Sequence, residues 1–338
     1  MKTLETIIMR YDRGQIVVVR DVAVSCECMA TICDFPVLSV PVSEEAKSLE
    51  TVQQIWDFFF AQGLTRRGLV ITIGGGVLTD LVGFAAATYK RGVDYVNIPT
   101  TLLAMIDASS GGKTGFNYHG LKNSIGVFAP PVETLIETEW LKTIPPQEFL
   151  SGYGEMLKTG LLDATLWPQL LQYDLDSMPI DTLTPLITQC LAVKERIVAQ
   201  DPKEEGLRKA LNFGHTFGHA LEEISLVESQ KSKEKSPLLH GYAVVYGLIA
   251  ELYLSVVKLG CSKAPLQQLT QIMLHYYGKP QCKCSDRARL IELMRQDKKN
   301  ERAGEINCTL IRTIGEPMIN QVITTEEAEE ALDYLFSL

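Results

Sequence analysis

Three of the five histidines in this chain fall in one segment, as His215, His219 and His240. His215 and His219 are four residues apart, so on a helix their imidazoles would share one face. Two imidazoles on one face suit a metal ion. The HExxH pattern of zinc proteases is absent, because no glutamate follows His215. A single buried histidine is more often a hydrogen-bonded core residue, so the clustering is what indicates a site.

A run of glycines could bind phosphate. Gly74, Gly75 and Gly76 follow a β-branched run and precede a segment rich in small residues. Glycines at a strand-to-helix turn let the backbone approach a pyrophosphate, and the helix N-terminus favours an anion. The GxGxxG fingerprint is absent, so these residues alone leave a nucleotide site and a simple turn as alternatives.

Lysines stand beside glycines in two further segments. Lys113 and Lys122 are predicted to lie in loops, where binding groups are commonly carried, and are the cations we expect to be functional. Glu155 and Lys158 are three residues apart, so a helix would place them on one face. If that face were exposed, the ion pair would contribute little to stability.

The elements that must position these groups alternate in the first part of the chain. Apolar spacing over residues 49–60 predicts a helix. Strands that alternate with helices form βαβ units and a parallel sheet covered on both faces. The predicted strands span residues 16–20, 37–40, 69–73 and 94–98.

The pattern changes near Ile144, Pro145 and Pro146. Beyond these residues the periodicity is mainly helical, with one strand predicted over 306–312 and an exposed loop over 229–237. We therefore expect an α/β N-terminal Rossmann-like domain with a parallel sheet over residues 1–146, and a mainly α-helical C-terminal domain over 147–338. The predicted helices span about 147–162, 181–200, 207–224, 238–257, 264–276 and 325–336.

Composition excludes several classes of protein. With 46% hydrophobic and 22% charged residues, the chain is an ordinary globular protein. A net charge of −9 argues against nucleic-acid binding and against a basic membrane-surface protein, so an anionic substrate would need a local cluster of cations. We find no signal peptide and no apolar run of about 18 residues, and therefore expect no membrane partner. The eight cysteines include no CxxC pair, which is typical of reduced thiols in the cytoplasm.

Taken in order, these segments resemble one family. They include the glycine turn, the Glu155–Lys158 pair and the histidine cluster, and they extend over about residues 21–300. Their order and spacing are similar to those of 3-dehydroquinate synthases, which are sugar-phosphate cyclases. The segments that carry the resemblance are 74–80, 87–92, 98–107, 111–114, 122–123, 155–158, 211–220 and 239–241.

The resemblance implies a lyase of the shikimate pathway that uses NAD and a divalent metal, zinc or cobalt. Family members convert 3-deoxy-D-arabino-heptulosonate 7-phosphate into 3-dehydroquinate and phosphate, as part of chorismate and aromatic amino-acid biosynthesis. The reaction proceeds through transient oxidation by NAD, phosphate elimination, re-reduction and intramolecular aldol closure. The family is usually homodimeric and cytoplasmic, which is what we expect here.

The resemblance also implies roles for individual residues. The metal ligands would be Glu155, His215 and His240, with His219 facing the substrate. The other residues expected to contact substrate or take part in catalysis are Arg91, Asp107, Lys113, Asn123, Lys158, Lys194, Glu204, Arg208, Asn212 and Lys299, the last chosen over Lys298. The expected cofactor contacts are Asp21, Glu44, Lys47, Gly74, Gly75, Gly76, Val77, Asp80, Thr100, Thr101 and Lys122.

Two departures and several alternatives accompany this assignment. Tyr242 stands where many members have an acidic residue, and the sequence around Asp21 matches only loosely. Another cyclase, such as a 2-deoxy-scyllo-inosose synthase, would share the metal and NAD sites, whereas retention of His219 argues against a valiolone-forming enzyme. A metal-dependent polyol dehydrogenase would not account for Lys113, Asn123 and Arg208 as a phosphate-binding set, and a non-enzymatic binding module would not account for so many matching polar positions.

Overall fold

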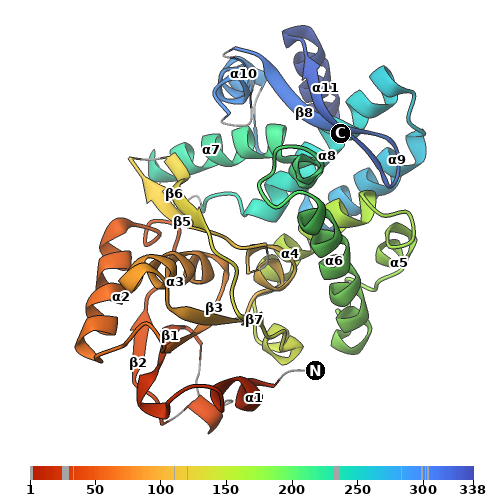
Figure 1. The fold of residues 1–338 in the computed structure, drawn as a ribbon. Helices are drawn as coiled ribbons and strands as arrows, with labels where there is room; N and C mark the ends of the chain where they lie inside the picture. The colour runs from red at the N-terminus through yellow and green to blue at the C-terminus, as the bar shows by residue number, and fades with distance from the viewer. Residues whose placement is uncertain are drawn as a thin grey trace. The chain divides into compact units, whose positions relative to one another are not determined.

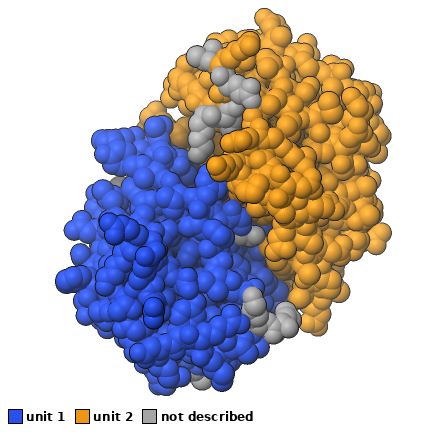
Figure 2. All heavy atoms as spheres, viewed as in Figure 1, with its two compact units in different colours: residues 1–144 blue, residues 145–338 orange. Residues whose placement is uncertain are grey.

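The computed structural model divides into two compact units, Met1–Ile144 and Pro145–Leu338 (Figures 1 and 2). It describes residues 3–24, 30–32, 34–109, 111–119, 121–231, 236–282, 284–297, 300, 302 and 304–338. Lys298 and Lys299 lie outside the described residues, so the choice between them stays a prediction.

The first unit is built on a five-stranded parallel sheet with the strand order β2-β1-β3-β4-β7. The four strands predicted from β-branched runs are all present, which confirms the α/β class. The strands are β1 (Ile16–Asp21), β2 (Val37–Val40), β3 (Leu69–Gly74), β4 (Asp94–Pro99) and β7 (Glu133–Thr134).

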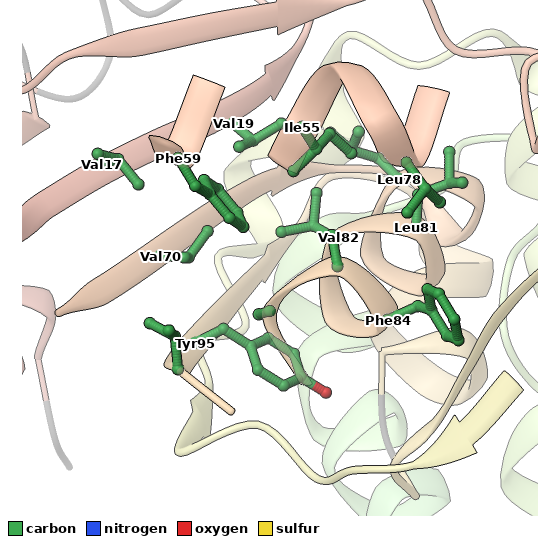
Figure 3. Packing of buried hydrophobic residues seen from close by; sticks show 14 of the residues in the cluster. Val17, Val19, Ile55, Phe59, Val70, Leu78, Leu81, Val82, Phe84 and Tyr95 are labelled. Carbon is green, nitrogen blue, oxygen red and sulfur yellow. The ribbon is translucent and has the colours of Figure 1, made fainter. Parts of the chain in front are cut away.

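Helices cover both faces of this sheet. Val17 and Val19 point to one face and pack with α2 (Leu49–Ala61) and α3 (Gly76–Thr88) in the cluster of Figure 3. Ile16 and Val18 alternate with them and pack on the other face against α1 (Leu4–Ile8). Successive strand side chains point to opposite faces, so a β-branched run without polar interruptions is what a strand buried on both faces requires.

A hairpin of β5 (Lys113–Tyr118) and β6 (Leu121–Phe128) lies between β4 and β7 in the chain. The prediction that Lys113 and Lys122 lie in loops is wrong, because both are strand residues. Gly115 faces Gly126 across the pair, and a Cβ at Gly115 would lie 2.4 Å from the Ile125 carbonyl oxygen. Glycine has low β-propensity, so the local sequence does not indicate strands here. The two segments form strands because they pair with each other.

The second unit is mainly helical, as predicted, with a two-stranded antiparallel sheet of β8 (Ile306–Thr313) and β9 (Glu316–Ile323). Strand β8 was predicted and β9 was not. The helices are α4 (Pro146–Leu161), α5 (Trp167–Leu171), α6 (Ile180–Gln200), α7 (His215–Lys231), α8 (His240–Leu259), α9 (Lys263–Ile272), α10 (Arg287–Arg295) and α11 (Thr325–Ser337).

The prediction of one continuous helix over residues 207–224 is wrong, because the segment is interrupted. A short 3-10 helix, η7 (Leu207–Asn212), ends before Gly214, and α7 begins at His215. Gly214 has a φ of +81°, a left-handed conformation that ends the first segment. The break places His215 at the first position of a helix.

Three helices of this unit approach one another at glycines. A Cβ at Gly241 in α8 would lie 1.7 Å from the Ser151 carbonyl oxygen of α4, and one at Gly247 would lie 1.9 Å from the Gly214 carbonyl oxygen before α7. Any larger residue would push the helices apart. The short side chains of α4, α7 and α8 can therefore meet at one point.

Helix α8 is relevant to the prediction that the chain has no apolar run long enough to cross a membrane. Among the described residues it alone has the length and composition of a membrane-crossing helix, with a mean hydropathy of 1.5, contrary to the expectation that the chain holds no such run. In the structure 67% of the 18-residue window is buried inside the protein. Buried core helices pass the same test of length and composition.

Candidate active site

Glu155 of α4, His215 of α7 and His240 of α8 converge in the second unit. One potential ligand atom from each lies within 4.8 Å of the other two. The Glu155 Oε1 atom is 3.1 Å from His240 Nε2 and 3.4 Å from His215 Nε2. One carboxylate and two imidazoles form the donor set of a catalytic zinc site with three protein ligands, so these residues fit a divalent metal.

The outer nitrogen of each histidine is also satisfied. His215 Nδ1 lies 3.1 Å from the Phe213 carbonyl oxygen, and His240 Nδ1 lies 3.3 Å from Glu222 Oε2. Donation from Nδ1–H to these acceptors leaves Nε2 of each histidine as the nitrogen that faces Glu155, which is the nitrogen that would bind a metal once it carries no proton.

Glu222 was not identified from the sequence. It lies seven residues after His215, a spacing that returns to the same face of a helix and could have indicated it. Tyr242, which stands where an acidic residue was expected, instead packs its ring on Tyr277 at a centroid distance of 4.8 Å. The carboxylate beside His240 therefore comes from α7.

Charge is concentrated in the interior of this cluster. Lys158 Nζ lies 2.5 Å from Glu155 Oε2, and the two side chains are 3% and 1% exposed. Burial acts to raise the pKa of Glu155, but Lys158 and the histidines outweigh it and hold the pKa well below its usual range. Burial and Lys158 lower the pKa of His215. A charged carboxylate and a neutral imidazole are the protonation states that metal binding requires.

The pKa of His240 is raised, whereas that of His215 is lowered. Burial acts to lower the pKa of His240, but Glu222 and Glu155 outweigh it and raise the pKa to about 10. The folded, metal-free protein therefore keeps a proton that a metal would displace.

We expect the metal-free protein to lose stability as the pH rises above 6.5. The pKa of His240 is about 10 in the folded chain and 6.5 ordinarily, so its stabilisation is complete below pH 6.5 and declines above it. Thermal unfolding in chelator should show a falling midpoint up to about pH 8.5, where cysteines begin to titrate. His240→Gln should remove this slope, and an unchanged slope in that variant would contradict the assignment.

His219 lies beside the three converging residues without joining them. Its ring centroid is 5.1 Å from that of His215 and 6.1 Å from that of His240. Its side chain is 40% exposed, and its Nδ1 lies 3.4 Å from Asp297 Oδ2. His219 is thus the most accessible of the three histidines, and its partner Asp297 was not predicted from the sequence.

The segment before α7, which includes η7, holds three of the predicted site residues. Asn212 donates to Glu204 Oε1 at 2.7 Å, and Glu204 has a φ of +62°. Arg208 is 2% exposed and donates through Nη1 to the Pro202 carbonyl oxygen at 2.7 Å. Asp201, another unpredicted residue, accepts from the backbone N–H groups of Gly206 at 2.7 Å and Arg208 at 3.0 Å. Lys194 is buried on the adjacent segment, α6.

In the first unit, the glycine turn lies at the carboxyl ends of parallel strands. A Cβ on Gly75 would lie 3.3 Å from Thr101 Cγ2, and one on Gly74 would lie 3.4 Å from Asp21 Cβ. The Thr100 N–H donates to the Gly74 carbonyl oxygen at 3.1 Å. This edge is where parallel α/β sheets bind ligands.

The N-terminus of α3 suits an anion. Its N-cap residue, Gly75, has no side chain to satisfy the first backbone N–H groups of the helix. Gly76 and Val77 form the first turn. Gly75 and Gly76 have no side chains that could cover these N–H groups, so the residues fit the phosphates of a dinucleotide.

Asn117, which was not predicted, connects Glu44 of the predicted cofactor set to Asn123 of the predicted substrate set. Lys47 Nζ lies 2.5 Å from Asp80 Oδ2. Asn117 donates to Glu44 Oε1 at 2.8 Å, and its Oδ1 accepts from the Asn123 N–H at 2.8 Å. Asn123 has a φ of +50°, and Lys122 precedes it on β6.

The remaining predicted residues of this unit do not all lie near the glycine turn. Arg91 ends the 3-10 segment η4 (Tyr89–Arg91) and precedes β4. It therefore lies near the amino-terminal ends of the parallel strands, whereas Gly74 lies at their carboxyl ends. Asp107 lies in η5 (Ala104–Ala108), after the carboxyl end of β4. Lys113 is the exposed first residue of β5.

The chain combines two features. Its first unit is Rossmann-like and has a glycine turn suited to phosphate, and its second unit is helical and has a candidate metal site. Together they define a class of two-domain enzymes that bind a dinucleotide and a metal. Family models described as 3-dehydroquinate synthase N-terminal and 3-dehydroquinate synthase C-terminal match residues 37–151 and 152–300. The chain belongs to the 3-dehydroquinate synthase family, which confirms the resemblance seen in the sequence.

Individual relatives agree with this membership. The 3-dehydroquinate synthase of Parabacteroides distasonis is 41% identical over 333 residues, covering 96% of this chain and 92% of that protein. The 2-epi-5-epi-valiolone synthase ValA of Streptomyces hygroscopicus subsp. jinggangensis, solved with NAD+ and Zn2+ bound, is 32% identical with a TM-score of 0.81, over 96% of this chain and 91% of that one. A 2-deoxy-scyllo-inosose synthase shares the fold with a TM-score of 0.82 at 21% identity, over 97% of this chain and 94% of that one.

Proposed function

We propose that this chain is a 3-dehydroquinate synthase, a lyase that converts 3-deoxy-D-arabino-heptulosonate 7-phosphate into 3-dehydroquinate and phosphate in the shikimate pathway. The observation that carries the proposal is the convergence of Glu155, His215 and His240 in a chain whose two units both match this family. We further propose that residues 1–146 form the NAD-binding domain and residues 147–338 the metal- and substrate-binding domain. We expect a homodimer in the cytoplasm.

The cofactors follow from the residues that fit them. Glu155, His215 and His240 would hold a divalent metal, zinc or alternatively cobalt, which when bound polarises hydroxyl groups of the substrate. The turn at Gly74, Gly75 and Gly76 would hold NAD, which when bound accepts and returns a hydride.

The chain's own groups bind the substrate and handle protons. Lys158, Lys194 and Arg208 are buried cations in a protein of net charge −9, and we assign them to the substrate carboxylate and phosphate. Lys113, Asn123, Arg91 and Lys299 extend this set. Asp107, and the bonded pair Glu204 and Asn212, are assigned to substrate hydroxyls. His219 is assigned to proton transfer at Nε2, since its Nδ1 faces Asp297.

We expect product formation without net NADH. The hydride leaves and returns within one turnover, so catalytic NAD should suffice and phosphate release should equal dehydroquinate formation. The measurement supplies the heptulosonate phosphate with zinc and a trace of NAD, and follows phosphate, dehydroquinate and the absorbance of NADH. Substrate deuterated at the oxidised carbon should retain its label in the product.

The alternatives give different results in the same assay. A polyol dehydrogenase consumes one NAD per product and transfers the deuterium to the cofactor pool. A 2-deoxy-scyllo-inosose synthase would leave the heptulosonate phosphate unchanged, so neither phosphate nor dehydroquinate would form. Either result would overturn the proposed function.

A further inference from the structure

Both candidate histidine ligands occupy the first position of a helix. His215 begins α7 and His240 begins α8. The first backbone N–H groups of a helix have no partner within it and usually bond to the side chain of the preceding residue. Here the preceding residues are Gly214 and Leu239, neither of which has a polar side chain. The helix starts that set the direction of both ligands must therefore be held by groups from elsewhere.

Glu251 supplies this contact for α7. It lies on α8 and is 0% exposed. Its Oε2 accepts from the Gly214 N–H at 2.7 Å, and its Oε1 accepts from the Thr216 N–H at 3.1 Å, so the carboxylate bonds to the residues on both sides of His215. Burying a carboxylate is costly without such bonds, and the N-terminus of a helix favours the negative charge.

Ser151 supplies the equivalent contact for α8. It lies on α4, four residues before Glu155, and is 2% exposed. Its Oγ accepts from the Gly241 N–H at 3.0 Å, directly after His240. The ligand-bearing helices thus support one another in turn. Helix α4 carries Glu155 and bonds to the N-terminus of α8. Helix α8 carries His240 and bonds to the N-terminus of α7.

We propose that Glu251 and Ser151 are positioning residues of the metal site, each of which fixes the helix start that directs a histidine ligand. This inference rests on the proposed function, because it assumes that the three ligands bind a metal. Groups that orient metal ligands commonly contribute 10- to 100-fold in metal affinity. They do so without touching the metal, by limiting the motion of the ligand atoms.

The test compares variants for zinc affinity and for thermal stability of the metal-free chain. Ser151→Ala removes the acceptor for the Gly241 N–H, and Glu251→Gln keeps the shape but turns an amide N–H toward a backbone N–H. Ser255→Ala is the matched control, since Ser255 is also fully buried on α8 and accepts the Ile311 N–H at 3.0 Å, away from both ligands. Zinc affinity is measured by competition with a chromophoric chelator.

Both Ser151→Ala and Glu251→Gln should weaken zinc binding by about 10- to 100-fold, and excess zinc should restore much of the lost activity of Ser151→Ala. Ser255→Ala should lower the unfolding temperature but change zinc affinity less than twofold. The inference is overturned if Ser151→Ala binds zinc as the parent does, or if Ser255→Ala weakens zinc equally. Ser151→Ala keeps the test decisive if Glu251→Gln fails to fold. A parent chain that binds no zinc would refute the proposed function itself.

Discussion

Replacing His215 with alanine is expected to remove zinc binding and dehydroquinate formation together. His215 Nε2 is 3.4 Å from Glu155 Oε1, and only one other imidazole completes the set of three ligands. A catalytic metal contributes several kcal/mol of transition-state stabilisation, so activity should fall on the order of a thousandfold or more. Metal content by atomic emission and initial rates of phosphate release provide the measurement.

His275→Ala serves as the matched control for this variant. His275 is exposed in the segment η8 (Met273–Tyr277), and its removal should leave both zinc content and rate close to those of the parent. If His215→Ala kept its zinc and more than a tenth of the parent rate, the assignment of His215 as a metal ligand would be wrong.

Replacing Lys158 with methionine should strongly destabilise the metal-free protein. The Lys158–Glu155 pair is almost fully buried, and removing one partner of a buried pair leaves an uncompensated charge at a cost of about 3–5 kcal/mol. Zinc should restore part of this loss, because a cation bound at Glu155 would replace the missing positive charge. Urea unfolding, with chelator and then with zinc, measures both effects.

Lys142→Met tests whether the effect comes from burial. Lys142 also pairs with a glutamate three residues away, Glu139, at 2.6 Å, but these side chains are 57% and 74% exposed. An exposed pair contributes about 1 kcal/mol or less, so this variant should be nearly neutral. Equal losses in the two variants would mean that the Lys158 pair has no special role.

Much of the architecture could be predicted from the sequence because it depends on local pattern. The β-branched runs that became β1, β3 and β4 are long enough to cross a buried sheet, and apolar periodicity identified α4, α6 and α8. The hairpin of β5 and β6 escaped this reasoning, because its glycines favour a strand only when the two strands lie against each other. The break at Gly214 escaped it for a similar reason, since α8 packs directly against that turn.

The candidate site likewise contains residues that could be predicted from the sequence and residues that could not. Glu155, His215 and His240 were selected from short strings whose order resembles a family, and the structure brings them together. The groups around them depend on tertiary contacts: Glu222 lies 18 residues from His240, and Glu251 lies 37 residues from Gly214.

The sequence by itself therefore determined which side chains are available for chemistry and which helices and strands carry them. Only the tertiary structure decided which carboxylates orient the histidines and hold their helix starts. The physical reason is that a residue's type determines what its side chain can bond to. Its partner is determined by which backbone atoms approach within hydrogen-bond distance once the helices have packed.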